Sequence, residues 1–209
     1  MKKCVVFDFD GTLADTEGFL REIYKDIAKQ KKWAALDRTK FRHLFTASIW
    51  DAALWARFRP WRLAHLVNQS RLRLQARSGE VKVFEGINKV IQDLSKNGYD
   101  IYVLSRNWQS TVQLVVDKNN LGEKVHVMEK PGFFSKHKSV KKLLSQKKYS
   151  PEQTWMVGDE VRDLYAAKRA GVPFIGVTWG FQDGKTLKAF KPTAIAKNPE
   201  EITKIILKN

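Results

Sequence analysis

The sequence predicts an α/β protein whose parallel sheet is covered by helices on both faces and whose first strand is separated from the others by a helical insertion. Over residues 83–209, short apolar runs alternate with segments of helical spacing. Residues 15–82 carry helical patterning without a clear strand, and an apolar run at residues 5–9 precedes them. The sheet must therefore assemble around an insertion.

The individual elements follow from this alternation in chain order. A strand and loop occupy residues 1–14, and Pro60 separates the last two of three helical stretches because proline interrupts a helix. Ser78 and Gly79 close this part of the chain. The three helical stretches are residues 17–30, 41–58 and 61–75. The later strands are expected at residues 99–105, 124–129, 154–160, 172–180 and 193–196. The later helices are expected at residues 87–98, 108–122, 135–148, 161–171 and 199–209.

These elements divide the chain into two predicted domains. Residues 1–14 and 83–209 form the core, and residues 15–82 form an all-helical cap. Open α/β sheets bind ligands at the carboxyl ends of their strands. Because the insertion follows the first strand, we expect the cap to lie over that edge as a lid.

The composition indicates a soluble protein that attracts anions. The chain has 209 residues, a formal net charge of +16 and one cysteine, Cys4, which excludes a disulfide framework. No apolar run approaches the roughly 18 residues of a membrane span, and the N-terminus lacks the pattern of a signal peptide. We expect a cytoplasmic protein. The charge alone does not choose between phosphorylated metabolites, nucleic acid, an anionic membrane surface and a merely solvated basic surface.

Carboxylates stand where the predicted strands end. Asp8 and Asp10 are one residue apart, so on a regular strand both face the same side. Asp159 and Glu160 end a later strand, and Asp163 follows one helical turn on. Because parallel strands end at the same edge of a sheet, we expect these acids to converge.

Such a site suits phosphoryl transfer. Mg²⁺ prefers oxygen ligands, which the carboxylates of Asp8 and Asp159 and the backbone carbonyl of Asp10 can supply. A carboxylate can also act as the nucleophile while a neighbouring acid gives and takes the protons. The Ser105 hydroxyl, the Lys136 ammonium and backbone N–H groups can neutralise a phosphate.

Four segments, in order, resemble the motifs of the haloacid dehalogenase (HAD) superfamily: DFDGTLADTEG, LSRN, a lysine-led helix and VGDEVRDLYAAKRAGV. The resemblance covers nearly the whole chain and is closest to phosphoglycolate-phosphatase-like members with a helical cap after the first motif. It implies a Rossmann-like parallel sheet and Mg²⁺-dependent hydrolysis of phosphate esters through an aspartyl-phosphate.

The resemblance also assigns roles by motif. Asp8 matches the nucleophile and Asp10 the acid and base, and the metal site comprises Asp8, Asp10 and Asp159. The presence of Asp10 favours a phosphatase or phosphomutase over a dehalogenase, whose members lack this acid. The residues expected to bind the substrate phosphate are Thr12, Ser105, Arg106 and Asn107. The supporting acids are Glu160 and Asp163.

The lysine of the third motif has three candidates. Lys136 is favoured because a helix start places it nearest the edge of the sheet. Lys138 is its rival. Lys130 precedes Pro131 and so resembles the family's Lys-Pro dipeptide, but it lies farther than usual from the following acidic motif.

The cap region, residues 15–82, mixes tryptophans with arginines, a composition that can bind nucleic acid. We favour a simpler interpretation, in which the tryptophans form a cap core and the arginines cover its surface. A third interpretation assigns Arg57 and Arg59 to an anionic group of the substrate. The favoured function is a phosphatase for a small phosphorylated metabolite. The alternatives are a phosphomutase and a basic protein acting on nucleotide or polynucleotide phosphates.

Overall fold

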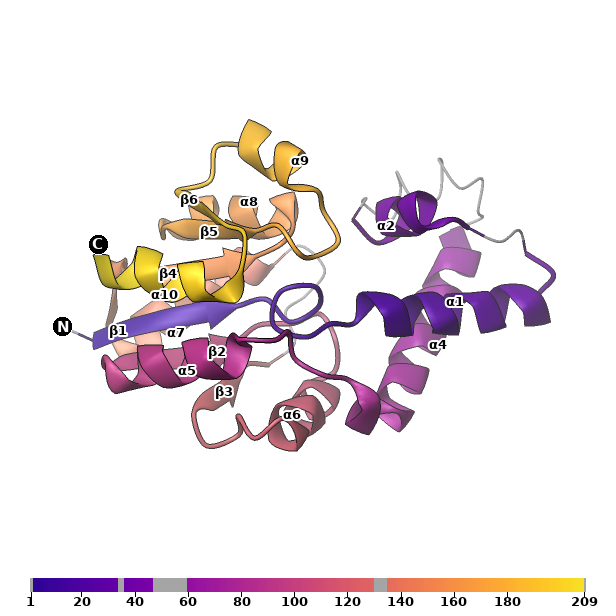
Figure 1. The fold of residues 1–209 in the computed structure, drawn as a ribbon, viewed down its shortest axis with the longest axis horizontal. Helices are drawn as coiled ribbons and strands as arrows, with labels where there is room; N and C mark the ends of the chain where they lie inside the picture. Colours follow the sequence, from indigo (N-terminus) through magenta and orange to yellow (C-terminus); the bar gives the residue numbers. More distant parts are fainter. Residues whose placement is uncertain (1, 34–35, 47–59, 130–134, 209) are drawn as a thin grey trace.

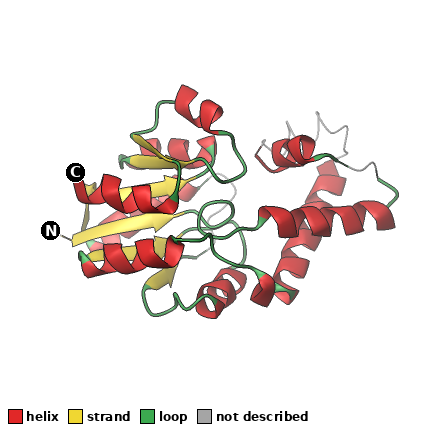
Figure 2. Ribbon diagram, viewed as in Figure 1, coloured by secondary structure: helices red, strands yellow, loops and turns green. Residues whose placement is uncertain are grey.

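The computed structural model describes residues 2–33, 36–46, 60–129 and 135–208, and this part of the chain contains a six-stranded parallel sheet (Figures 1 and 2). The strands lie in the order β3-β2-β1-β4-β5-β6. This Rossmann-like order confirms the predicted fold class. The strands are β1 (Lys2–Phe7), β2 (Tyr99–Val103), β3 (Val125–Val127), β4 (Tyr149–Gly158), β5 (Phe174–Val177) and β6 (Ala194–Ala196).

Helices cover both faces of the sheet, and the side chains of β1 alternate between the two resulting cores. Val5 and Phe7 pack in the core that α5, α6 and α10 share. Cys4 and Val6 pack in the core that α7 and α8 share. A strand that is buried on both faces has to be apolar throughout, because successive residues point to opposite sides. These helices are α5 (Ile87–Lys96), α6 (Gln109–Lys118), α7 (Lys136–Lys147), α8 (Val161–Ala170) and α10 (Pro199–Lys208).

The strand β4 is longer than the sequence indicates. It begins at Tyr149, and its pairing with β1 shifts register between Lys2 and Cys4. Pro151 lies in the additional stretch. A proline has no N–H to give to a ladder of hydrogen bonds, which explains why an apolar pattern alone did not reveal this part of the strand.

A short helix, α9 (Gly184–Ala189), is absent from the sequence-based prediction. Asp183 caps it, because its side chain accepts hydrogen bonds from the backbone N–H groups of Lys185 and Thr186. The helix is too short to give a periodic apolar pattern, since six residues are fewer than two full turns.

The described part of the cap region is helical and lies to one side of the sheet (Figure 1). The first predicted helix has the expected bounds, and the third begins at Pro60. The predicted helix 41–58 is represented by α2, and its remainder lies outside the described residues. The elements are α1 (Glu17–Gln30), α2 (Arg38–Thr46), α4 (Pro60–Ala76) and the short 3-10 helix η1 (Ser78–Glu80).

The cap region has an apolar cluster of its own, which includes Ile23 of α1, Phe41 of α2 and Leu66 of α4. Trp33 packs against it, whereas Trp61 is 61% exposed. The predicted tryptophan core is therefore only partly present in the described residues; Trp50 and Trp55 lie outside them.

The two connections between the cap region and the sheet run side by side. The backbone N–H of Asp15 donates to the carbonyl of Lys82, and the N–H of Phe84 donates to the carbonyl of Leu13. These bonds lie where the sequence suggested a boundary, between residues 14 and 15 and between residues 82 and 83. The division into two domains remains a prediction. Across the described residues, no helix is both long and apolar enough to cross a membrane.

Candidate active site

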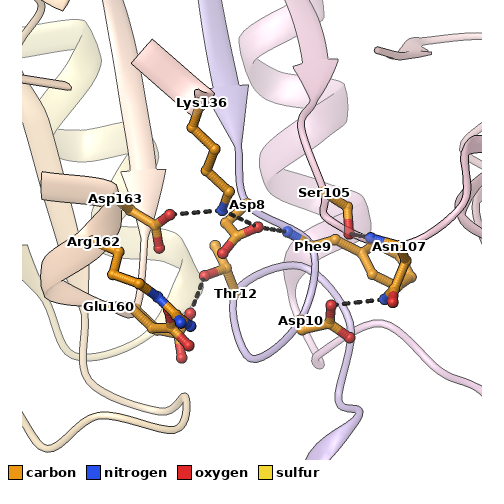
Figure 3. Close-up of polar contacts among 11 residues, drawn as sticks. Asp8, Phe9, Asp10, Thr12, Ser105, Asn107, Lys136, Glu160, Arg162 and Asp163 are labelled. Atoms are coloured by element: carbon orange, nitrogen blue, oxygen red, sulfur yellow. Dashed lines mark hydrogen bonds and ion pairs between the residues drawn. The ribbon is translucent and has the colours of Figure 1, made fainter. Parts of the chain in front are cut away.

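The loop after β1 directs its two aspartates differently from the expected regular strand. β1 ends at Phe7, and the chain turns so that the N–H groups of Leu13 and Ala14 both donate to the carbonyl of Phe9. The carboxylates of Asp8 and Asp10 consequently have different partners (Figure 3). The alternation of a regular strand therefore does not apply to these two carboxylates, because the strand has already ended at Phe7.

An acidic cluster forms where β1 and β4 end, at the point where the strand order reverses. Its members are Asp8, Asp159 and Asp163, which are all buried and each offer an oxygen within 4.8 Å of the others. Asp8 follows β1, Asp159 follows β4, and Asp163 lies in the first turn of α8. The predicted convergence of carboxylates from distant segments is thus present in the structure.

Lys136, the first residue of α7, compensates part of this negative charge. Its Nζ lies 2.8 Å from Oδ1 of Asp8 and 2.7 Å from Oδ1 of Asp163 (Figure 3). The rival Lys138 is exposed, and Lys130 lies outside the described residues. Of the two lysines that can be compared, only Lys136 contacts the acidic cluster.

The electrostatics differ among the three acids. Burial by itself raises the pKa of Asp8, but the Lys136 ammonium and the Phe9 N–H outweigh burial and hold this pKa below its ordinary value. Burial, followed by the charges of Glu160, Asp8 and Asp163, raises the pKa of Asp159 well above its usual range. Burial, followed by the charge of Asp8, also raises the pKa of Asp163. The cluster thus holds more negative charge than one lysine balances.

Asp159 is held on two sides. Its Oδ1 accepts a hydrogen bond from the Thr12 hydroxyl at 2.9 Å, and its Oδ2 accepts one from the backbone N–H of Phe181 at 2.7 Å. Thr12 was expected to bind phosphate, but its buried hydroxyl contacts this acid instead. Gly11 has a φ of +73°, and a Cβ there would lie 2.6 Å from Oδ2 of Asp159, so the loop requires glycine.

Asp10 lies on the opposite side of Asp8 from Asp163 in Figure 3. Its Oδ2 accepts a hydrogen bond from the Asn107 side chain at 2.8 Å, and its Oδ1 is buried without a hydrogen-bond partner in the described structure. Burial, followed by the charge of Asp8, raises the pKa of Asp10 to about 6. An acid with this pKa can both give and take a proton near neutral pH.

The loop after β2 presents Ser105, Arg106 and Asn107 to the same edge. The Ser105 oxygen accepts the Asn107 N–H at 3.0 Å, which leaves the serine O–H available as a donor. Arg106 is half-exposed, and its charge acts on Asp8 and Asp10. The three residues expected at the phosphate therefore lie beside the expected nucleophile and acid.

Glu160 does not join the acidic cluster. Its carboxylate is paired with Arg162, whose Nε donates to it at 2.6 Å (Figure 3). Arg162 has no counterpart in the sequence-based assignment of the site. Its pairing places Glu160 beside the cluster rather than within it.

The donor set fits a hard divalent cation. Three buried carboxylates within 4.8 Å repel one another, and Oδ2 of Asp163 is buried without a hydrogen-bond partner in the described part of the chain. Oxygen-only donors of this kind suit Mg²⁺. The cluster contains the carboxylate of Asp163, which was expected only to support the site, and lacks that of Asp10, which was expected to offer its backbone carbonyl.

Phe181 is a site residue that the sequence did not reveal. It contributes a backbone N–H, which every residue except proline carries, so its residue type holds no signal. The neighbouring Gly180 offers one, because a Cβ there would lie 2.3 Å from Oδ2 of Asp159. A glycine at the end of an expected strand can mark such a close approach.

A Rossmann-like sheet that carries an acidic cluster where β1 and β4 end, with a lysine paired to that cluster, defines the HAD class of hydrolases. Residues 5–177 match the family model described as haloacid dehalogenase-like hydrolase, and the chain belongs to this family. The predicted resemblance and the prediction of a hydrolase are thereby confirmed.

Named relatives of this chain include phosphatases. The chain is 24% identical over 205 residues to the phosphoglycolate phosphatase of Synechococcus elongatus, covering 98% of this chain and 97% of that protein. It is 27% identical over 205 residues to a 5'-nucleotidase of Pseudomonas aeruginosa, covering 90% and 88%. A haloacid dehalogenase-like hydrolase from Streptococcus pneumoniae superposes with a TM-score of 0.85 at 21% identity, covering 98% of each chain. These relatives support a HAD-family phosphatase.

Proposed function

We propose that the protein is a Mg²⁺-dependent phosphatase that hydrolyses a small phosphate monoester through a phosphorylated Asp8. The observation that carries this proposal is the arrangement of Asp8, whose carboxylate lies 2.8 Å from Lys136 and within 4.8 Å of two further buried carboxylates. A nucleophilic carboxylate needs to stay ionised and to meet a neutralised phosphate, and this environment supports both.

The first step transfers the phosphoryl group to the enzyme. An oxygen of Asp8 attacks phosphorus, and the bond between phosphorus and the leaving oxygen breaks. Protonated Asp10 gives its proton to the leaving oxygen, so that an alcohol departs. Ser105 and Lys136 donate hydrogen bonds to the phosphoryl oxygens.

The second step releases phosphate. Asp10, now a carboxylate, takes a proton from water as the water oxygen attacks phosphorus. The bond between phosphorus and Asp8 breaks, which restores the Asp8 carboxylate and the Asp10 acid and frees inorganic phosphate. The cap region closes over the reacting groups to keep bulk water out and reopens for release.

The carboxylates of Asp8 and Asp159 and the backbone carbonyl of Asp10 would hold the metal, with Asp163 at its side. When bound, Mg²⁺ supplies positive charge that neutralises the cluster and the phosphate. Thr12 and the Phe181 N–H keep Asp159 in place for this task.

A panel of phosphate esters assayed with Mg²⁺ tests the proposal, with wild type compared with Asp8→Asn. The names of relatives suggest two esters, phosphoglycolate and a 5'-nucleotide, and one anhydride, pyrophosphate, which comes from the pyrophosphatase PpaX of Bacillus mycoides. We expect the wild type to release phosphate from at least one ester and Asp8→Asn to release none. Equal rates for the two proteins would contradict the proposal.

Two controls separate the alternatives. Release of phosphate without a bisphosphate activator distinguishes hydrolysis from a phosphomutase reaction. Retention on DNA with a steep dependence on salt would instead indicate nucleic-acid binding. The described arginines Arg73 and Arg77 pair with Asp26 and Glu22 of α1, which supports the interpretation that such arginines cover the surface of the cap region.

A further inference from the structure

One arginine of the cap region differs from its neighbours on α4. Arg73 pairs with Asp26, and Arg77 pairs with Glu22 and Glu80. Arg71 has neither an ion pair nor a hydrogen bond with any residue that the structure describes. It is nevertheless only half-exposed.

The position of Arg71 on α4 explains where it lies. Residues three positions apart share one face of a helix, so Arg71 shares a face with Leu74. Leu74 is buried and packs in the same core as Phe9 and Leu13, which lie on either side of Asp10 in the chain. This face of α4 is therefore turned toward the sheet.

Arg71 approaches the candidate active site from this face. Its charge interacts with Arg106 and with Asp10, and burial, followed by Arg106, lowers the pKa of Arg71. Arg106 also lacks an ion pair and a hydrogen bond within the described chain. Two guanidinium groups thus lie near each other at the Asp10 side of the site, and no carboxylate of the described residues pairs with either.

Two such cations are more than the transferred phosphoryl group requires. In the proposed function, that group lies between Asp8, Lys136 and Ser105, while Asp10 serves the leaving oxygen. A guanidinium group beside Asp10 therefore lies close to the part of the substrate that is attached to the leaving oxygen. Guanidinium groups bind carboxylates and phosphates through paired hydrogen bonds.

We propose that Arg71, together with Arg106, binds a second anionic group on the leaving alcohol. The preferred substrate class is then a phosphate ester whose leaving group carries a carboxylate or a second phosphate. This inference rests on the proposed function and narrows it, because a nucleoside 5'-monophosphate has a neutral leaving group and falls outside this class.

The test compares leaving groups across matched variants. Wild type, Arg71→Gln and Arg73→Gln are assayed with Mg²⁺ on 2-phosphoglycolate, on the bisphosphate of ethane-1,2-diol and on 2-hydroxyethyl phosphate, in which a neutral hydroxymethyl group replaces the carboxylate. Arg73→Gln removes an equal charge from the same helix but leaves the site untouched. Melting temperatures of all three proteins are measured alongside.

We expect the wild type to prefer one of the two anionic leaving groups over the neutral one in kcat/KM. Arg71→Gln should lower kcat/KM for that ester by roughly 10- to 100-fold, the usual effect of losing a charged hydrogen bond. The neutral ester should be hydrolysed as before, which also shows that the variant is folded. Which anionic ester loses more identifies the group as carboxylate or phosphate.

Other outcomes overturn the inference. A wild type that prefers the neutral ester, or an Arg71→Gln variant that loses activity on all three esters equally, would refute the role of Arg71 while leaving the proposed phosphatase intact. A loss of preference in Arg73→Gln as large as that in Arg71→Gln would refute it as well. Failure of the wild type to hydrolyse any of these three esters would refute the inference, and the proposed function would be refuted as well only if the wider panel, including a 5'-nucleotide, also released no phosphate.

Discussion

Replacing Asp10 with asparagine removes a buried negative charge that the metal-free protein holds at a cost. The fold raises the pKa of Asp10 from 3.8 to about 6, and each pH unit corresponds to about 1.4 kcal/mol. Above pH 6, the ionised carboxylate therefore destabilises the folded state by about 3 kcal/mol. Asparagine keeps an oxygen that can accept the hydrogen bond from Asn107, so Asp10→Asn should recover most of this free energy.

The expected signature is a stabilised but inactive protein. For a chain of 209 residues, about 3 kcal/mol corresponds to a rise in melting temperature of about 6–12 °C at pH 8 in EDTA. Because a raised carboxylate pKa disfavours the folded state only as the acid ionises, the advantage should grow from pH 4 to pH 6 and then stay constant. Phosphatase turnover should fall to background.

The matched control is Asp15→Asn, which removes the same charge from an exposed position nearby. It should leave both the melting temperature and the activity close to those of the wild type. The assignment of a raised pKa to Asp10 would be refuted in either of two cases. The Asp10→Asn variant could melt at or below the wild-type temperature at pH 8, or the difference between the two melting temperatures could be independent of pH.

Three further changes probe other parts of the structure. Lys136→Met leaves two buried carboxylates without their cation and should lower the free energy of unfolding in EDTA by about 3–5 kcal/mol; an unchanged urea midpoint would contradict the ion pairs of Lys136. Gly11→Ala forces a side chain into a positive-φ position and against the acidic cluster, so it should destabilise the protein by more than 1 kcal/mol and reduce Mg²⁺ binding measured by calorimetry. Burial would raise the pKa of Glu17, but Arg38 and Arg42 outweigh burial and lower this pKa to about 2. The ionised Glu17 therefore contributes stability that is present above pH 4.5 and lost toward pH 2. After allowance for solvent screening, Glu17→Gln should lower the free energy of unfolding by about 1 kcal/mol at pH 7 and leave it unchanged at pH 2 in urea titrations.

The sequence predicts the sheet and its helices because their burial requires apolar residues at regular spacing. The buried residues 4–7 of β1 form an unbroken apolar run, and α5 places Ile87, Val90 and Ile91 on one face. Elements without such periodicity are missing from the sequence-based prediction. The start of β4 is hidden by Pro151, and α9 is too short to show a repeat.

The candidate site also contains some residues that the sequence pattern can place and others that it cannot. Asp8, Asp159 and Lys136 can be placed from sequence because strand ends and a helix start bring them to one edge. The orientation of Asp10 and the use of the Thr12 hydroxyl depend on the turn after β1, which the residue pattern does not define. The approach of Arg71 depends on how α4 packs on the sheet, and no local pattern contains that information.

Phe181 joins two parts of the molecule that the sequence keeps apart. Its ring belongs to the apolar cluster of the cap helices, while its N–H donates to Asp159. If those helices move, either the Phe181 ring loses its apolar contacts with them or the Phe181 N–H moves away from the Asp159 carboxylate. If Asp159 holds the proposed Mg²⁺, the affinity for this ion and the position of the cap helices are coupled, and by reciprocity a change that strengthens one must strengthen the other.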